Sequence, residues 1–298
     1  MRATLLLCLG AALAIAKPPA SLWCSRRAFA CVGTTAAVLS GGLARPRSAH
    51  ALIGGKRATA FEAARNGVVG LYISMEDCDV CIKGLPAACT GVLIGRRLVL
   101  SASHCLDLTE GLGGALTKIV FGDSLLVPNP LAVPVEKFVL ASQYGREKNN
   151  DLMLIKLAHD APSNWVVQRI APAPAPSQDG SSFSAANYPE LEIIGFGDTD
   201  DDENKYSAGL LSRLRLQAIS PVSAATFLTM TLSNLAGTCS GDSGAAVIAT
   251  GAASGGVVGV LSSNSVPCTG SKGLFVSPAA FRDFIRRGAK DLDLPSPV

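Results

Sequence analysis

Residues 237–244 read Gly-Thr-Cys-Ser-Gly-Asp-Ser-Gly. A serine between two glycines, with an aspartate before it, indicates a nucleophile on a tight turn. Gly241 and Gly244 allow the backbone to approach a substrate closely and to adopt angles that a Cβ atom would forbid. A serine hydroxyl is a poor nucleophile alone, so Ser243 needs a base within hydrogen-bond reach and a group that orients this base. Backbone amides must also face the oxyanion that forms.

The base and the acid that this nucleophile needs are found elsewhere in the chain. Histidine occurs three times, and His104 follows an apolar run, residues 98–100, and a turn of small residues. Asp151 opens the hydrophobic run of residues 152–157, which would bury its carboxylate beside the imidazole. The chain order His, Asp, Ser differs from the orders in subtilisin and in the α/β-hydrolases. We therefore expect His104 to act as the base and Asp151 as the acid that orients it.

The segments that contain His104, Asp151 and Ser243 resemble, in their order and spacing, those of the chymotrypsin-like serine endopeptidases of the trypsin fold, peptidase family S1. The resemblance covers residues 52–288. The resemblance implies an all-β fold of two packed antiparallel six-stranded β-barrels with a C-terminal helix, which the sequence pattern places at residues 277–287. It also implies a serine endopeptidase that forms an acyl-enzyme intermediate through a catalytic triad of His104, Asp151 and Ser243.

The resemblance assigns further roles around this triad. The backbone amides of Gly241 and Ser243 should form the oxyanion hole, and Ser262 should donate a hydrogen bond to Asp151. The competing interpretation is a protease-like fold that binds a partner without catalysis. Such relatives usually lose a triad member, whereas all three are present here. An esterase or other acyl transferase would use the same chemistry, but the residue order and the cysteine pattern argue against it.

The family's substrate pocket corresponds to four positions of this chain: Gly237, Thr238, Asn264 and Gly273. Trypsin-like members carry an aspartate where Gly237 stands, so a preference for Arg or Lys is not expected. Asn264 replaces a usual glycine and should narrow the entrance. The resemblance therefore implies a substrate with an uncharged P1 residue of small to medium size.

Six of the nine cysteines lie beyond residue 51, and an even number fits an oxidising compartment. The family pattern pairs Cys89 with Cys105 and Cys239 with Cys268, which leaves Cys78 and Cys81 for each other. A Cys-x-x-Cys spacing also occurs in redox sites and in zinc sites, although a small disulfide that clamps a loop is the favoured interpretation. We expect no metal ion and no other cofactor.

Residues 1–51 have the pattern of a targeting leader. The apolar run of residues 4–16 indicates a secretory signal peptide, because a membrane span needs about 20 apolar residues. A second unit follows, in which Arg26 and Arg27 precede a mildly apolar stretch and the small-x-small site at residues 49–51. This unit resembles a twin-arginine export signal. Two signals in series resemble the leaders of thylakoid-lumen proteins in algae with complex plastids; the alternative is a signal peptide and a propeptide of a secreted, extracellular protein.

Cleavage after Ala51 would expose a new amino terminus, Leu52, followed by Ile53-Gly54-Gly55. In the family that the chain resembles, such an apolar terminus folds inward, and its ammonium pairs with the aspartate before the nucleophile, here Asp242. An uncompensated buried carboxylate is costly, so this partner matters. We therefore hypothesise that removal of the leader is also the activation step.

The charge distribution bears on the partners. The formal charge of +3 arises from the leader, which has six basic residues and no acidic one, so residues 52–298 carry a net charge of −3. Nucleic-acid binding has no support from this balance. We expect a monomer that acts on protein or peptide substrates, that protein inhibitors can bind, and that has no membrane segment after leader removal.

The acidic loop of residues 198–203 could bind calcium, select basic substrates or simply be solvated. The expected organisation is a leader at 1–51, a protease domain at 52–288 and a short tail at 289–298.

Overall fold

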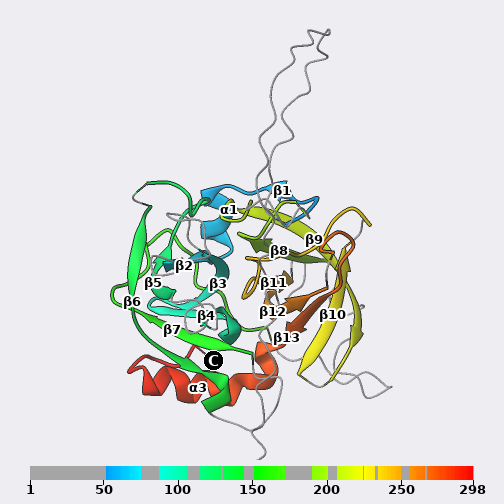
Figure 1. Ribbon diagram of the computed structural model, residues 1–298. Coiled ribbons are helices and arrows are strands. Elements are labelled where there is room, and N and C mark those ends of the chain that lie inside the picture. Colours follow the sequence, from blue (N-terminus) through cyan, green and yellow to red (C-terminus); the bar gives the residue numbers. More distant parts are fainter. Residues whose placement is uncertain are drawn as a thin grey trace, which may run out of the picture. The chain divides into compact units, whose positions relative to one another are not determined.

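The described part of the chain consists mostly of β-strands, with short helices near both of its ends (Figure 1). The computed structural model describes residues 52–74, 87–106, 114–128, 130–143, 151–171, 190–200, 207–223, 225–231, 234–249, 255–265 and 267–297. The expected leader and the pair Cys78 and Cys81 lie outside these residues, as does most of the acidic loop, residues 201–206.

The first half of the fold is a closed antiparallel barrel with the strand order β2-β3-β4-β7-β6-β5. Its strands are β2 (Val68–Ser74), β3 (Ala87–Gly95), β4 (Leu98–Ser101), β5 (Ala115–Val120), β6 (Ala132–Leu140) and β7 (Met153–Leu157). Every residue of β4 and of β7 is buried, so both faces of these two strands are covered by protein.

The period-two alternation of side chains explains how one strand contributes to two cores. In β4, Val99 lies in the cluster that fills the first barrel, whereas Leu98 and Leu100 belong to a second cluster. That second cluster also contains Ile248 and Val260 from the other half of the chain. Burial of apolar surface on both faces of β4 therefore holds the two halves of the fold together.

The second half contains six strands that also close on themselves. They are β8 (Leu191–Gly195), β9 (Ser212–Pro221), β10 (Thr226–Thr231), β11 (Ala246–Ala249), β12 (Gly256–Asn264) and β13 (Gly273–Val276). They follow the order β9-β10-β13-β12-β11-β8, and pairing of β8 with β9 closes the ring. The short strand β1 (Lys56–Arg57) adds to β9. The expected fold of two six-stranded antiparallel barrels is confirmed.

The helices are short and lie outside the barrels. The first, α1 (Ala60–Arg65), starts at a capping box in which Thr59 and Glu62 satisfy each other's backbone amides. Single 3-10 turns are η1 (Ser103–Leu106) and η2 (Ala141–Gln143). Within the described residues, no helix has the length and apolar character needed to span a membrane.

The C-terminal helix begins where the sequence indicates but ends later. A 3-10 turn, η4 (Pro278–Phe281), leads into α3 (Arg282–Asp291), so the domain boundary expected at residue 288 falls inside a helix. Leu292 just beyond α3 is fully buried. Gly288 allows the close approach of α3 to the first barrel, because a Cβ atom there would lie 2.8 Å from Leu154 Cδ1.

Candidate active site

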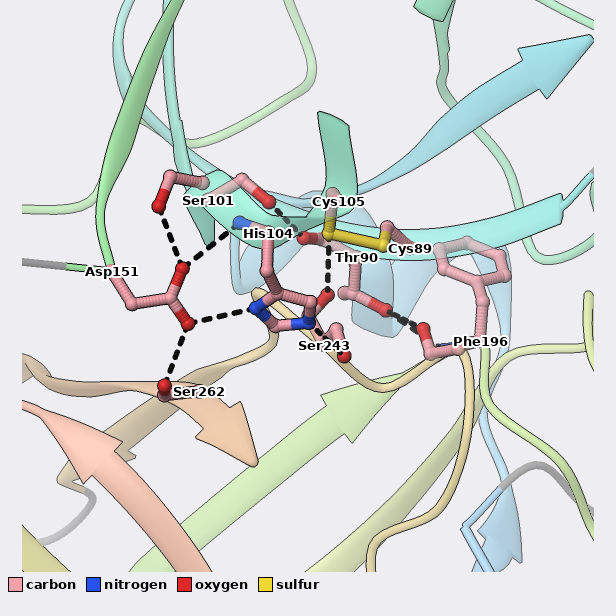
Figure 2. The surroundings of a disulfide bond; sticks show 11 residues. Cys89, Thr90, Ser101, His104, Cys105, Asp151, Phe196, Ser243 and Ser262 are labelled. Carbon is pink, nitrogen blue, oxygen red and sulfur yellow. Dashed lines mark hydrogen bonds and ion pairs between the residues drawn. A yellow bond between two sulfur atoms is a disulfide. The ribbon is translucent and has the colours of Figure 1, made fainter. Parts of the chain in front are cut away.

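The strand pairing brings the expected base and acid to the same end of the first barrel. Strands β4 and β7 are antiparallel neighbours, with Ser101 opposite Met153. His104 lies in η1, directly after β4, and Asp151 lies directly before β7. Ser243 lies on the turn that precedes β11 in the second barrel, so the three side chains meet between the barrels (Figure 2).

The three side chains form an unbroken row. His104 Nδ1 lies 2.7 Å from Asp151 Oδ2, and His104 Nε2 lies 2.8 Å from Ser243 Oγ. A neutral imidazole with its proton on Nδ1 donates to the carboxylate and accepts the serine hydroxyl proton at Nε2. This arrangement can therefore remove the Ser243 proton during attack on an electrophile.

Asp151 is held by more donors than the sequence indicated. Its Oδ1 accepts hydrogen bonds from Ser103 Oγ at 2.7 Å and from the backbone amide of His104 at 2.9 Å. Its Oδ2 accepts a further bond from Ser262 Oγ at 2.6 Å. Burial raises the pKa of Asp151, but the hydrogen bond and charge of His104, with the hydroxyl of Ser262, outweigh burial and hold this pKa well below its ordinary range. The carboxylate is therefore ionised beside the imidazole.

Ser103 was not anticipated by the sequence analysis. The one indication in the sequence was that Ser103 directly precedes His104. A side chain at the start of the 3-10 turn lies close to the groups that His104 contacts. Turn serines are common, however, and this one could be assigned only after the position of Asp151 was known.

The turn that carries Ser243 needs both of its glycines. Gly241 and Gly244 have φ angles of +94° and +82°, which side-chain-bearing residues rarely adopt. A Cβ atom on Gly244 would also overlap Ser101 Oγ and the carbonyl oxygen of Thr90. Within the described residues, the amides of Gly241 and Ser243 donate no hydrogen bond. Both amides are therefore available to an oxyanion.

Asp242, next to Ser243, is fully buried. Its Oδ1 accepts the Gly197 amide at 2.8 Å and its Oδ2 accepts the Cys239 amide at 2.9 Å. Burial raises the pKa of Asp242 to about 7, although these two amides act in the opposite direction. Asp242 forms no ion pair with a described residue.

Leu52 lies close to this region. Its side chain is fully buried in a cluster with Ile193 and Ala245, and its φ angle is +61°. Ile53 follows and forms a bridge with Gly237 at the expected substrate pocket. The side chains of Leu52 and Ile53 are therefore both buried, whereas Gly54 and Lys56 that follow are exposed.

Gly237, one of the expected pocket positions, lies against uncharged groups. A Cβ atom on Gly237 would overlap the carbonyl oxygen of Cys268 and would lie 2.8 Å from Ser271 Oγ. Ser271 Oγ donates to the carbonyl oxygen of Thr238 at 3.2 Å. Thr238 Oγ1 is buried and has no hydrogen-bond partner within the described residues.

The two remaining pocket positions lie on the adjacent strands. Asn264, at the end of β12, has its Nδ2 3.6 Å from Cys268 Sγ. Gly273 begins β13, and a Cβ atom there would lie 2.6 Å from the ring of Phe275. The aromatic ring of Phe275 thus occupies the space that a larger side chain at position 273 would need.

Both disulfides implied for the described residues are present. Cys89–Cys105 joins β3 to the turn that carries His104 (Figure 2). Cys239–Cys268 joins the segment before the nucleophile to the pocket. Each bond therefore constrains one side of the site.

Comparisons with known proteins identify the family of the chain. A family model described as Trypsin matches residues 63–285. The chain is 31% identical over 195 residues to snake venom serine proteinase 11 of Crotalus adamanteus, which covers 60% of this chain and 68% of that protein. It is 29% identical over 168 residues to serine protease 1 of Homo sapiens, which covers 55% of this chain and 65% of that protein.

A solved structure supports the fold. HL collagenase matches with a TM-score of 0.57 at 20% identity, covering 80% of this chain and 99% of the collagenase chain. At that identity the likeness concerns the fold alone. The family match, by contrast, covers residues 63–285, which span most of both barrels. The chain therefore belongs to the trypsin family of serine endopeptidases.

Proposed function

We propose that this chain hydrolyses peptide bonds with Ser243 as the nucleophile, His104 as the general base and Asp151 as the residue that orients His104. The supporting observation is the unbroken row from Asp151 through His104 to Ser243, with contacts of 2.7 Å and 2.8 Å. No cofactor takes part in this proposal. The substrates are proteins or peptides, as membership of this family of endopeptidases implies.

The proposed reaction has two halves. Ser243 Oγ attacks the peptide carbonyl carbon while His104 Nε2 takes the hydroxyl proton, and the carbonyl oxygen becomes an oxyanion that accepts the amides of Gly241 and Ser243. His104 then gives the proton to the leaving amine, and the acyl-enzyme remains. A water molecule, deprotonated by His104, releases the carboxylic acid and restores the Ser243 hydroxyl.

A fluorophosphonate probe tests this assignment against a catalytically silent binding protein. The chain that begins at Leu52 should be labelled and should cleave an unfolded protein substrate, and Ser243→Ala should do neither. A silent protein would bind its partner without labelling and without cleavage. Labelling that survives in Ser243→Ala would contradict the proposed nucleophile.

The proposed P1 preference is for uncharged residues of small to medium size. The carbonyl oxygen of Cys268 and the hydroxyl of Ser271 lie against Gly237, where an acidic side chain would be needed to pair with Arg or Lys. The ring of Phe275 occupies space beside Gly273. Moving a cationic side chain into this neutral pocket would cost desolvation without a compensating charge.

A panel of peptides that differ only in their P1 residue should reveal this preference. We expect kcat/KM for P1 Ala, Val or Ser to exceed that for P1 Arg by at least about 100-fold, because a missing partner for a buried charge costs several kcal/mol. The Ser243→Ala chain provides the background rate for each peptide. Preferential cleavage after Arg or Lys would refute the proposed pocket.

Activation is proposed to occur by release of Leu52. The buried Asp242 carboxylate has no ion-pair partner in the described residues, and Leu52 is already buried in the second barrel. A new ammonium at Leu52 could supply the missing positive charge once residue 51 is removed. Sequencing of the mature amino terminus tests this step directly, because a terminus other than Leu52 would exclude it.

The free energy of unfolding should depend on pH differently before and after this cleavage. The folded chain keeps the Asp242 proton up to a pKa of about 7, whereas the unfolded chain releases it near the ordinary pKa of 3.8. Between these values the folded state binds more protons, so the stability of the uncleaved chain should fall as the pH rises. In the chain that begins at Leu52, the ammonium should pair with the carboxylate, and this fall should be much smaller. Urea unfolding at about pH 5 and about pH 7.5 measures both slopes.

Two controls assign this pH dependence to Asp242. The substitution Asp242→Asn should remove the fall from the uncleaved chain. Burial also raises the pKa of Asp198, and the charge of Asp198 raises the pKa of Asp242. Asp198 is present in both the cleaved and the uncleaved chain, so its effect on the pH dependence should cancel when the two chains are compared. Equal slopes in the cleaved and uncleaved chains would contradict the proposed ion pair.

Export and a monomeric state complete the proposal. Snake venom serine proteinase 11 is named as a venom protein, which is in keeping with an exported chain. The destination of the exported protein is either the thylakoid lumen of a complex plastid or the extracellular space, and the leader pattern is compatible with both. We propose no nucleic-acid partner and no membrane association after leader removal, and protein inhibitors as further partners. Fractionation together with size-exclusion chromatography distinguishes these alternatives.

A further inference from the structure

Thr90, on β3 of the first barrel, contacts the nucleophile turn of the second barrel through several polar atoms. It is fully buried. Its Oγ1 donates to the carbonyl oxygen of Gly241 at 3.0 Å, and its backbone amide donates to the carbonyl oxygen of Ser243 at 2.8 Å. Its own carbonyl oxygen accepts Ser101 Oγ at 2.7 Å. Thr90 therefore holds the carbonyl groups of both residues whose amides are assigned to the oxyanion hole.

The Thr90 hydroxyl has a second partner. The backbone amide of Phe196, just after β8, donates to Thr90 Oγ1 at 3.1 Å (Figure 2). A hydroxyl has one proton and can accept as well as donate, so the proton of Oγ1 goes to Gly241 and a lone pair receives Phe196. The next amide, that of Gly197, donates to Asp242 Oδ1 at 2.8 Å. One hydroxyl thus joins β3, the end of β8 and the nucleophile turn.

We propose that Thr90 is a positioning residue for the oxyanion hole, an inference that rests on the proposed function. Gly241 has a φ angle of +94° and no side chain, so the peptide groups beside it are held by hydrogen bonds to other segments. The Ser240 carbonyl oxygen accepts the Asp198 amide at 2.7 Å, and the Asp242 amide donates to the Cys239 carbonyl oxygen at 3.1 Å. The Thr90 hydroxyl adds a bond to the Gly241 carbonyl, which shares a peptide group with the Asp242 amide, and the Thr90 amide holds the Ser243 carbonyl, which shares a peptide group with the Gly244 amide. These two peptide groups adjoin the ones that carry the Gly241 and Ser243 amides. Donors that are oriented before the reaction need no reorganisation when the oxyanion forms, which is the main source of their catalytic effect.

The substitution Thr90→Val isolates the hydroxyl, because valine has nearly the same shape. It would leave the buried Phe196 amide without its acceptor and the Gly241 carbonyl without its donor. The substitution Thr90→Ser keeps both bonds and removes only a methyl group. The pair of variants therefore separates hydrogen bonding from packing.

Kinetics on a peptide substrate test the proposal, with active sites counted by fluorophosphonate titration. We expect Thr90→Val to lower kcat about 10- to 100-fold, with KM changed less than about twofold, because an oxyanion-hole donor acts in the transition state and its complete loss costs about 100- to 1,000-fold. A peptide aldehyde, whose adduct carries an oxyanion, should bind more weakly to Thr90→Val by a similar factor. Thr90→Ser should stay within about threefold of the wild type in both measurements.

A purely structural role predicts a different result. Thr90→Val would then have a lower melting temperature but an unchanged kcat per titrated site and unchanged aldehyde affinity, which would overturn the proposal. If Thr90→Val does not fold, Thr90→Cys, with a weakly donating thiol, replaces it with the same expectations.

Failure of the proposed function can be distinguished from failure of this inference. A wild-type chain that is neither labelled nor active would refute the proposed function. The inference would then be decided by crystal structures of the two variants. A Gly241 carbonyl that is displaced in Thr90→Val and in place in Thr90→Ser supports positioning by the hydroxyl, and an undisturbed carbonyl in both overturns it.

Discussion

Replacing Ser243 with alanine should lower kcat of the chain that begins at Leu52 by about 10⁶-fold, because the reaction would lose its covalent route. Ser243 Oγ lies 2.8 Å from His104 Nε2, a contact through which the imidazole can take the serine proton. Without the hydroxyl, the oxyanion hole and substrate binding would still give a residual rate of about 10³–10⁴ over water. Single-turnover kinetics on an activated peptide ester would measure a loss of this size.

Two further variants show whether Ser243 and His104 act as a unit. His104→Ala should lose nearly as much as Ser243→Ala, and the double variant should be hardly slower than either, because one broken step removes the whole route. Ser240→Ala, an exposed serine in the same turn, is the matched control and should keep the wild-type rate. Additive losses in the double variant would contradict a shared mechanism.

The substitution Asp151→Asn should lower kcat by about 10⁴-fold while the chain remains folded. Asp151 accepts from Ser103 and from the backbone amide of His104 on one oxygen, and from His104 Nδ1 and Ser262 on the other. All of these partners are donors, and an asparagine offers only one oxygen and an amide group that cannot accept. The imidazole would then favour the tautomer with its proton on Nε2, which cannot take the Ser243 proton.

Ser262→Ala provides the comparison for this prediction. It removes one of the donors to Asp151 without changing the carboxylate, so kcat should fall much less, by about tenfold. Both variants should be measured for kcat and for thermal unfolding. A similar loss of activity in the two variants would mean that Asp151 acts through general packing of the site and not through the tautomer of His104.

The parts of the account that were predictable from sequence depend on periodicity and on rare residues. The continuous apolar run of Leu98, Val99 and Leu100 indicates a strand, and in the structure its side chains separate between two cores. Histidine is scarce, so His104 could be identified by elimination and context. The glycines that flank the nucleophile indicate a turn, and Gly241 does have a positive φ angle.

The parts that were missed depend on contacts between distant segments. The partners of the Thr90 hydroxyl, Gly241 and Phe196, are 151 and 106 residues away in the chain, and no local pattern relates them. Ser103 was missed for the same reason, because its hydrogen bond depends on where Asp151 lies in the fold. The close approach of Gly288 in α3 to Leu154 is likewise a contact between distant segments, and helix propensity carries no information about it.

The most direct test of the account is a crystal structure of the chain that begins at Leu52 with a peptide boronic acid. We predict a covalent bond between boron and Ser243 Oγ, with one boronate oxygen about 2.7–3.1 Å from the amides of both Gly241 and Ser243. His104 Nε2 should contact the second boronate oxygen and keep its Nδ1 on Asp151. A boronate bound to any other atom, or bound to Ser243 with its oxygens turned away from these two amides, would contradict the central claim.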